Sequence, residues 1–358
     1  MTEATQPLPV RPRRDALTAL PRVCGLALAT PASSMTQDEA LSLLGLAEDP
    51  FAREIFSRCG VRRRHLELSP DTVQTSLQSR TPATEARLLA LATQAVDELE
   101  IDPAEIGVVV TATYYSLGGP TLAHRLVDRY GLAPDTDKYH LVGVGCASAV
   151  PLFRLASQAL RDRPGQQALV VAAESVSGFM TAAAPGDGKV KVVGSALFGD
   201  GCGAALITHA DAAPGPAIVA TAVHQVPDTL DHVRFAVTGA DSHMQIAREL
   251  PAIAESGLST IVDDFLGDRG LTVADVDHWL VHPGGRGIVE GVQRGLALTD
   301  EQVASSVHVL AEFGNVGTPS AFFVLADTLE RHEPASGDHG LMVTIGPGVT
   351  VGLMLLAW

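Results

Sequence analysis

The sequence predicts an α/β protein built from two similar halves, and three observations support this prediction. From Arg22 onward, short β-branched runs alternate with longer helical patterns, which is typical of α/β architecture. Segments of the first part of the chain recur in the same order in the second part. The 358 residues are 46% hydrophobic, which is enough to bury a large core and excludes a disordered chain.

The first half contains strands and helices that the residue pattern makes easy to place. Runs dominated by Val, Ile, Leu and Ala predict buried strands over 107–113, 138–144, 169–173 and 202–208. Longer segments with helical periodicity predict helices over 83–99 and 147–160.

The second half repeats this order. The strand expected over 275–282 corresponds to the one at 105–112, and the helix expected to open at Gly314 corresponds to the one at Gly145. A strand from Leu341 then corresponds to the strand at 169–173. An internal duplication of about 150 residues, the size of an ordinary domain, is the simplest interpretation.

The duplication predicts how the chain is divided. We expect residues 1–20 to form a flexible arm, 21–212 the first half and 213–358 the second half. A pseudo-twofold axis would then relate the halves and bring their corresponding helix starts together near the middle of the molecule.

Composition excludes several classes of protein. Forty-one acidic residues against 25 basic ones give a net charge of −16, which argues against nucleic-acid binding. The apolar runs are far shorter than the roughly 18 residues of a membrane span, and the first 14 residues lack the apolar core of a secretion signal. The four cysteines are scattered and form no CxxC pair, which favours a reducing cytoplasm and predicts no metal site.

Three residues stand at the ends of predicted elements and carry reactive side chains. Cys146 follows a strand and opens a helix, where backbone N–H groups and the helix dipole would favour a thiolate. His282 ends a strand and is followed by Pro-Gly-Gly, so its imidazole would point into the crevice at the strand ends. Asn315 occupies the position of the second half that corresponds to Cys146.

Each of these residues has an ordinary alternative when it is taken alone. Cys146 would be an inert buried cysteine, His282 a structural histidine and Asn315 a helix N-cap. Together, a cysteine nucleophile, an imidazole and an amide form a set that can transfer acyl groups and stabilise an oxyanion.

With these residues in place, the sequence resembles the thiolase superfamily and, within it, the type III polyketide synthases (chalcone and stilbene synthase-like enzymes). The matching motifs cover nearly the whole chain from Arg22 onward, and a bacterial member is expected. They include GCASAVPLFRLA from Gly145, ALFGDGCGAALI from Ala196, HPGGRGIVEGVQRGLAL from His282, EFGNVGTPSAFFVL from Glu312 and GPGVTV from Gly346.

The resemblance implies a five-layered fold of duplicated αβαβα halves and a homodimer. It also implies that Cys146 takes a starter acyl group from coenzyme A, while His282 and Asn315 bind the thioester oxygen of malonyl-CoA. Loss of carbon dioxide then gives an enolate that attacks the acyl-Cys146 thioester, and the cycle repeats until cyclisation or release. No cofactor beyond the CoA substrates is expected.

The family's pocket residues map onto this chain with departures. Phe198 matches a gatekeeper phenylalanine, and the second gatekeeper falls on Met244, whose flexible side chain predicts a wider neck. Further pocket positions are Tyr114, Tyr115, Val176, Phe179, Gly317 and Pro347. Bulky aromatic residues would narrow one side and the glycine would open another, so a chalcone product is not expected.

Coenzyme A carries phosphates that need cations. The run formed by Arg58, Arg62, Arg63 and Arg64 lies near where family members place their CoA-binding residues, although a solvated arginine face is the alternative.

Three other functions stay open from the sequence alone. A β-ketoacyl-ACP synthase III-like enzyme would use the same triad for one condensation with an acyl carrier protein. A papain-like thiol hydrolase also uses Cys, His and Asn but would lack the duplicated halves. A non-catalytic partner subunit of the same fold is the third.

Overall fold

The computed structural model describes residues 20–114, 118–183, 188–238 and 241–358, with the side chains of 235–238 and 241–245 left out. The predicted arm at 1–20 therefore lies almost entirely outside the described residues. Within the described part of the chain, no helix combines the length and the apolar character needed to cross a bilayer.

Nine strands of the described chain form one mixed sheet in the order β11-β12-β13-β8-β1-β7-β6-β4-β5. The first half supplies β1 (Arg22–Ala29), β4 (Ile106–Thr113), β5 (Asp137–Val142), β6 (Gln167–Glu174) and β7 (Gly201–Thr208). The second half supplies β8 (Ala217–Gln225), β11 (His278–Val281), β12 (His339–Gly346) and β13 (Thr350–Ala357).

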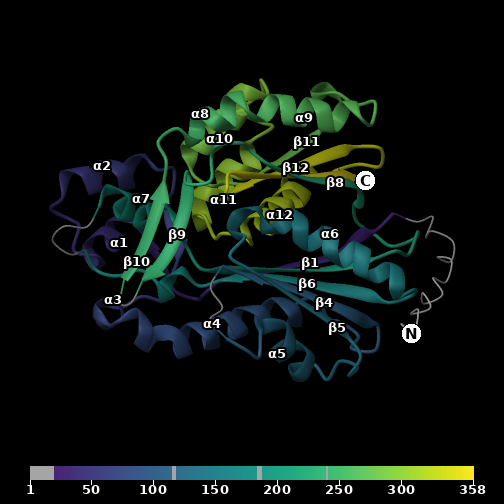
Figure 1. Cartoon of the computed structure of the whole chain (residues 1–358), viewed down its shortest axis with the longest axis horizontal. Helices are drawn as coiled ribbons and strands as arrows, with labels where there is room; N and C mark the ends of the chain where they lie inside the picture. Colours follow the sequence, from purple (N-terminus) through teal and green to yellow (C-terminus); the bar gives the residue numbers. More distant parts are fainter. Residues whose placement is uncertain (1–19, 115–117, 184–187, 239–240) are drawn as a thin grey trace, which may run out of the picture.

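The two halves repeat the same topology, which accounts for the repetition seen in the sequence. Strands β1-β7-β6-β4 correspond to β8-β13-β12-β11, with antiparallel, antiparallel and parallel pairs in the same places. Between β1 and β8 the ladder has one residue pair, Arg22 with Ala217, and at this point the nine strands divide into two β layers (Figure 1). The boundary expected at 212/213 falls between β7 and β8, and we propose it as the division between the halves.

Helices complete five layers in the order αβαβα, which confirms the predicted α/β thiolase-like fold (Figure 1). The outer layer of the first half contains α4 (Leu77–Asp97) and α5 (Leu122–Arg129). The middle layer contains α6 (Ala149–Ala159) and α12 (Ser320–His332), and α11 (Ala304–Phe313) lies beside it. The outer layer of the second half contains α8 (Leu250–Ser256), α9 (Leu258–Gly267) and α10 (Arg286–Gly295).

The middle layer holds the halves together. Phe153 on α6 stacks on Phe322 on α12 with their ring centroids 5.1 Å apart, and both side chains are fully buried. Glycines let the layers approach closely, since a Cβ on Gly203 of β7 would lie 2.4 Å from Phe322 Cβ. Burial of such aromatic side chains stabilises the docked halves by several kcal/mol each, in the range of about 3–5 kcal/mol for Phe→Ala changes.

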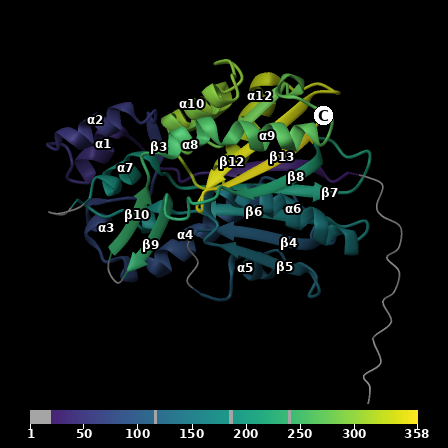
Figure 2. The ribbon, with the colours of Figure 1, turned by 45° about the horizontal axis from the view of Figure 1, so that its top comes forward.

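Smaller elements gather at one end of the sheet and form a cap over the strand ends (Figures 1 and 2). They are β2 (Ser34–Thr36), α1 (Gln37–Leu43), α2 (Pro50–Arg58), β3 (Arg63–His65), α3 (Pro70–Gln74), α7 (Lys189–Leu197), β9 (Val233–Thr238) and β10 (Asp241–Ile246). Helices α1, α2 and α7 share one apolar cluster that includes Phe56 and Ala196.

Strand β11 is shorter than the predicted 275–282. Residues Val273–Asp275 form a 3₁₀ turn, because Thr272 and Asp275 cap each other reciprocally and withdraw these backbone groups from the sheet. The strand ends at Val281, one residue before the predicted end at His282, and His282 follows it directly.

Candidate active site

Cys146 lies in a 3₁₀ turn, Gly145–Ser148, between β5 and α6. Gly145 has φ +65°, and a Cβ there would lie 3.0 Å from both Pro347 and the Tyr114 ring. Only glycine fits this left-handed position, so the strand can turn sharply and present the Cys146 side chain. The predicted helix begins three residues later than Cys146, at Ala149.

Burial dominates the electrostatics of this cysteine. It raises the pKa of the Cys146 thiol to about 12, and the nearby Glu174 carboxyl adds to the rise. The expectation that a helix N-terminus would favour the thiolate is not met, because Cys146 precedes the first residue of α6 and burial favours the neutral thiol.

His282 is 2% exposed, and its backbone N–H donates to Val343 O at 2.8 Å. Burial lowers the pKa of its imidazole to about 4, so the ring is neutral at physiological pH. Neither ring nitrogen has a hydrogen-bond partner within the described residues. A neutral imidazole facing a cavity can accept a proton or donate a hydrogen bond to a ligand.

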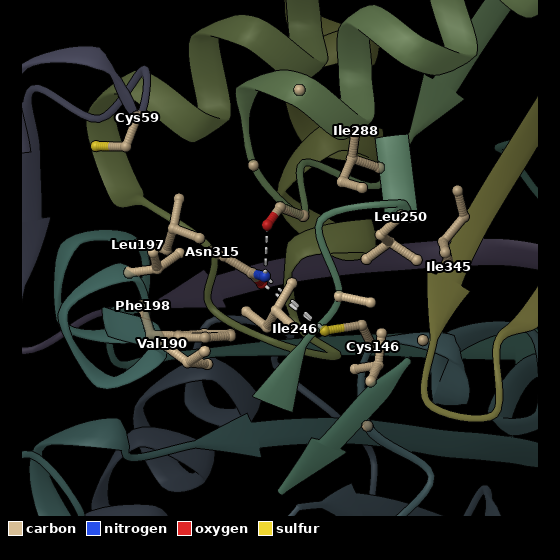
Figure 3. A pocket seen from close by; sticks show the side chains of 18 of the residues that line it. Cys59, Cys146, Val190, Leu197, Phe198, Ile246, Leu250, Ile288, Asn315 and Ile345 are labelled. Atoms are coloured by element: carbon tan, nitrogen blue, oxygen red, sulfur yellow. Dashed lines mark hydrogen bonds between the residues drawn. The ribbon is translucent and has the colours of Figure 1, made fainter. Parts of the chain in front are cut away.

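Asn315 lies in an extended segment before α12, so it is not the helix N-cap of the alternative interpretation. Its Oδ1 accepts from Gly317 N at 2.9 Å and from Ser320 Oγ at 3.4 Å, and its Nδ2 donates to Gly284 O at 3.3 Å. These contacts fix the amide beside Cys146, whose Sγ lies 3.9 Å from both Nδ2 and Oδ1 (Figure 3).

One cavity of about 910 Å³ joins the three residues, although they come from both halves of the chain. Figure 3 shows Cys146 and Asn315 next to each other and joined by dashed lines, with Phe198 and Leu197 on one side and Leu250 and Ile288 on the other. The predicted pocket residues Tyr114, Val176, Phe179, Phe198, Gly317 and Pro347 also line this cavity. Tyr115 and the Met244 side chain lie outside the described residues.

Glu174, at the end of β6, lines the same cavity and was missed by sequence reasoning. It is 4% exposed, and both carboxyl oxygens accept from Tyr114 N, at 2.9 and 3.0 Å. Burial raises its pKa to about 8 in spite of these hydrogen bonds. An acidic residue closing the apolar run LVVAAE was the signal that could have identified it.

Gly317 has a different role from the one that its small size suggested. Its φ is +69°, and a Cβ would lie 2.9 Å from Glu174 Cγ. The glycine therefore allows the turn after Asn315 and the close approach of Glu174, and it does not simply widen the pocket.

The arginines predicted to bind coenzyme A are found in three different environments. Arg58 lines the cavity and pairs with Glu54. Arg62 and Arg63 both pair with Glu312 and are not among the lining residues.

Arg64 is fully buried, so its inclusion in the basic run as a CoA ligand was wrong. Other cations, missed by sequence reasoning because they are far apart in the chain, do line the cavity. They are Lys189, Arg234, Arg248 and Arg286. Among the described residues, no cluster of three or more His, Cys, Asp or Glu side chains is arranged to hold a metal.

Comparison with known proteins agrees with this geometry. Residues 32–226 match the family described as FAE1/Type III polyketide synthase-like protein, and residues 217–357 match the chalcone and stilbene synthases, C-terminal domain. The chain is 31% identical to the alpha-pyrone synthesis polyketide synthase-like Pks18 of Mycobacterium tuberculosis, over 92% of this chain and 89% of the relative. It is 26% identical to the 3,5-dihydroxyphenylacetyl-CoA synthase of Amycolatopsis balhimycina, over 100% and 98%.

Solved structures give the same result. PKS-I from the brown alga Ectocarpus siliculosus superposes with a TM-score of 0.86 at 27% identity, covering 96% of this chain and all of the other. The duplicated thiolase-like fold rules out the papain-like alternative, and the family matches do not favour a β-ketoacyl-ACP synthase III-like enzyme. The chain belongs to the type III polyketide synthase family, and its Cys, His and Asn side chains share one cavity at the junction of its two halves.

Proposed function

We propose that this enzyme carries out iterative decarboxylative condensation of malonyl-CoA onto an acyl starter bound to Cys146, followed by cyclisation or release. The observation that carries the proposal is the meeting of Cys146, His282 and Asn315 in one cavity. In the first step the Cys146 sulfur attacks the acyl-CoA carbonyl and the bond from this carbonyl to the CoA sulfur breaks. During the attack the thiol proton passes through His282 to the departing CoA sulfur, which leaves as the thiol. The backbone N–H of Cys146 is the proposed donor to the oxyanion of this acyl transfer.

The second step uses the donors that the fold holds in place. His282 and the Asn315 amide bind the thioester oxygen of malonyl-CoA, so that loss of carbon dioxide leaves its electron pair on an enolate that they stabilise. The enolate carbon then attacks the acyl-Cys146 thioester, a carbon–carbon bond forms, and the Cys146 sulfur leaves. No metal or redox group is required by this sequence of steps.

The cations that line the cavity support CoA thioesters as substrates. Arg58, Lys189, Arg248 and Arg286 come from different parts of the chain and all line it, Arg58 being paired with Glu54 and Arg286 with Glu290. Helices α7 and α10 begin at Lys189 and Arg286, and no side chain of the described residues caps either start, so N–H groups at these helix starts can donate to phosphate oxygens. We assign the CoA phosphates to this group of cations in place of Arg62 and Arg63.

The cavity supports an uncharged, largely apolar starter acyl group. Its inner wall contains mainly aliphatic and aromatic side chains, among them Leu197, Phe198, Leu250, Ile288 and Ile345 (Figure 3). A charged acyl chain would lose its hydration there without gaining a partner.

A homodimer and a cytoplasmic location complete the proposal. Strand β5 is at the edge of the sheet, and its Tyr139 and Val142 are 37% and 46% exposed. A second copy that paired there would cover this edge close to Gly145 and Cys146.

The four free thiols fit a reducing compartment. An acyl carrier protein is not required.

The experiment is incubation of the purified protein with radiolabelled malonyl-CoA and a panel of acyl-CoA starters, with mass spectrometry of the products. Wild type should elongate apolar starters by two-carbon units. Cys146→Ala should not condense but should still decarboxylate malonyl-CoA, because His282 and Asn315 remain. A protein that never consumes malonyl-CoA, or a Cys146→Ala variant with full condensation activity, would sink the proposal.

Two further measurements test the binding residues and the assembly. Arg286→Ala should raise KM for acyl-CoA several-fold with little change in kcat, whereas Arg63→Ala, its matched control, should not. Analytical ultracentrifugation should give a dimer for wild type and a monomer for Val142→Asp; a monomeric wild type at micromolar concentration would contradict the dimer.

A further inference from the structure

Arg64 on β3 is an arginine in an unusual place. Its side chain is fully buried, which arginine rarely is unless it has a carboxylate partner. Instead its Nη1 donates to two backbone carbonyls, Ser195 O at 2.6 Å and Phe198 O at 2.9 Å. Its Nε and Nη2 have no partner within the described residues. Since a buried charge without a counter-ion costs stability, a gain elsewhere is expected.

The two carbonyls belong to the C-terminal end of α7, where the last C=O groups of a helix lack partners within it. A cation at this end also interacts favourably with the helix dipole. Burial lowers the pKa of the Arg64 guanidinium to about 10, so it stays charged at neutral pH. Arg64 thus fixes the point at which the chain leaves α7.

The segment at the end of α7 forms backbone hydrogen bonds with Asn315. Asn315 N donates to Leu197 O at 2.8 Å, Gly199 N donates to Asn315 O at 3.1 Å, and Phe198 and Asn315 form an isolated parallel bridge. The backbone N–H and C=O of Asn315 are therefore tied to Leu197 and Gly199, the two neighbours of Phe198, whose carbonyl accepts from Arg64.

The stem of Arg64 also packs directly beside this bridge. A Cβ on Gly314 (φ +70°) would lie 3.0 Å from Arg64 Cγ, and a Cβ on Gly199 would lie 3.6 Å from Arg64 Cβ. The arginine therefore contacts both segments of the bridge with its aliphatic part and one of them with its charged end.

We propose that Arg64 is a positioning residue: it ties the end of α7 to the Phe198–Asn315 bridge and so fixes the Asn315 amide relative to Cys146 for decarboxylation and condensation. The inference rests on the proposed role of Asn315. Arg64 itself does not line the cavity, so it acts through the bridge. A displacement of the amide by about 1 Å is enough to lower a rate by up to 100-fold.

The test is a double-mutant cycle between Arg64→Gln and Asn315→Ala, with malonyl-CoA decarboxylation followed by release of labelled carbon dioxide. In the wild-type background Arg64→Gln should lower kcat by about 10- to 100-fold with less than about a threefold change in KM. In the Asn315→Ala background the same substitution should change kcat less than about twofold, because the group it positions is gone.

Arg80→Gln is the matched control. Arg80 is also buried, at 5% exposed, and donates to a backbone carbonyl, but this carbonyl is that of Met180, which is not part of the bridge. It should lower the melting temperature without lowering kcat at a temperature where the variant is folded. Arg64→Lys keeps the charge but can donate well to only one of the two carbonyls, so its kcat should lie between those of Arg64→Gln and wild type. It replaces Arg64→Gln in the cycle if that variant does not fold.

The outcomes separate the two proposals. Equal losses from Arg64→Gln in both backgrounds, an unchanged kcat in Arg64→Gln, or an equal kcat loss in Arg80→Gln would overturn the positioning role. An Asn315→Ala variant that decarboxylates malonyl-CoA at the wild-type rate would instead overturn the proposed function on which it rests.

Discussion

Glu174 provides a measurable link between the buried site and the stability of the protein. In the unfolded chain its carboxyl ionises near pH 4.3, whereas in the folded protein burial raises its pKa to about 8. Between these values the folded state holds one proton more than the unfolded state, so the free energy of unfolding falls as pH rises. The slope is about 1.4 kcal/mol per pH unit and the total is roughly 5 kcal/mol, complete above about pH 8.

Glu174→Gln removes this titration and keeps an oxygen that can accept from Tyr114 N. We expect the stability of wild type relative to the variant to fall steadily from pH 5 to pH 8 and then to level off. The assay is urea unfolding at unit steps of pH, with each free energy extrapolated to water. Groups that do not interact with Glu174 titrate equally in both proteins, so their contributions cancel in the difference.

Asp200→Asn is the control for the pH range over which the stability difference is expected to fall. Asp200 is also fully buried, but burial raises the pKa of its carboxyl only to about 6. The stability difference between wild type and this variant should therefore level off near pH 6. A Glu174→Gln difference that is independent of pH, or that levels off together with the Asp200→Asn difference, would refute the reasoning.

Three further substitutions test the packing and the local geometry. Phe322→Ala removes the stack with Phe153 and should destabilise the protein by about 3–5 kcal/mol in urea unfolding, whereas a loss below about 1 kcal/mol would show that the halves do not depend on this contact. Asp49→Ala removes the N-cap of α2, whose carboxylate accepts from Phe51 N at 2.8 Å, and should cost about 1 kcal/mol in the same assay; no loss would mean that water replaces the cap. Gly317→Ala should cost about 1–3 kcal/mol because of its positive φ, and a melting temperature equal to that of wild type would contradict the strain.

Much of the fold followed from the sequence because each half repeats one pattern of apolar runs. The predicted strands at 107–113 and 202–208 agree with β4 and β7 to within one residue. Helix starts were less predictable, since Gly314 and Gly317 adopt positive φ values and delay α12 until Ser320. Such conformations depend on close approaches to other parts of the chain, which one sequence does not display.

The candidate site was predictable where residue type and element ends coincide, as for Cys146 and His282. The buried and distant residues were not. Glu174 and the cations Lys189, Arg248 and Arg286 reach the cavity through topology, and no local spacing connects them. The charge on Cys146 was also beyond sequence reasoning, because its pKa depends on burial that only the packed structure defines.

The candidate site exists only when the two halves pack against each other, because it lies at their junction. Cys146 belongs to the first half, while His282 and Asn315 belong to the second. The halves meet closely beside the nucleophile, since a Cβ on Gly346 at the end of β12 would lie 2.5 Å from Ala147 N. Neither half alone can hold more than part of the reaction. If the chain were cut in the loop between β7 and β8, activity would therefore report reassembly of the two pieces, in the manner of a split enzyme.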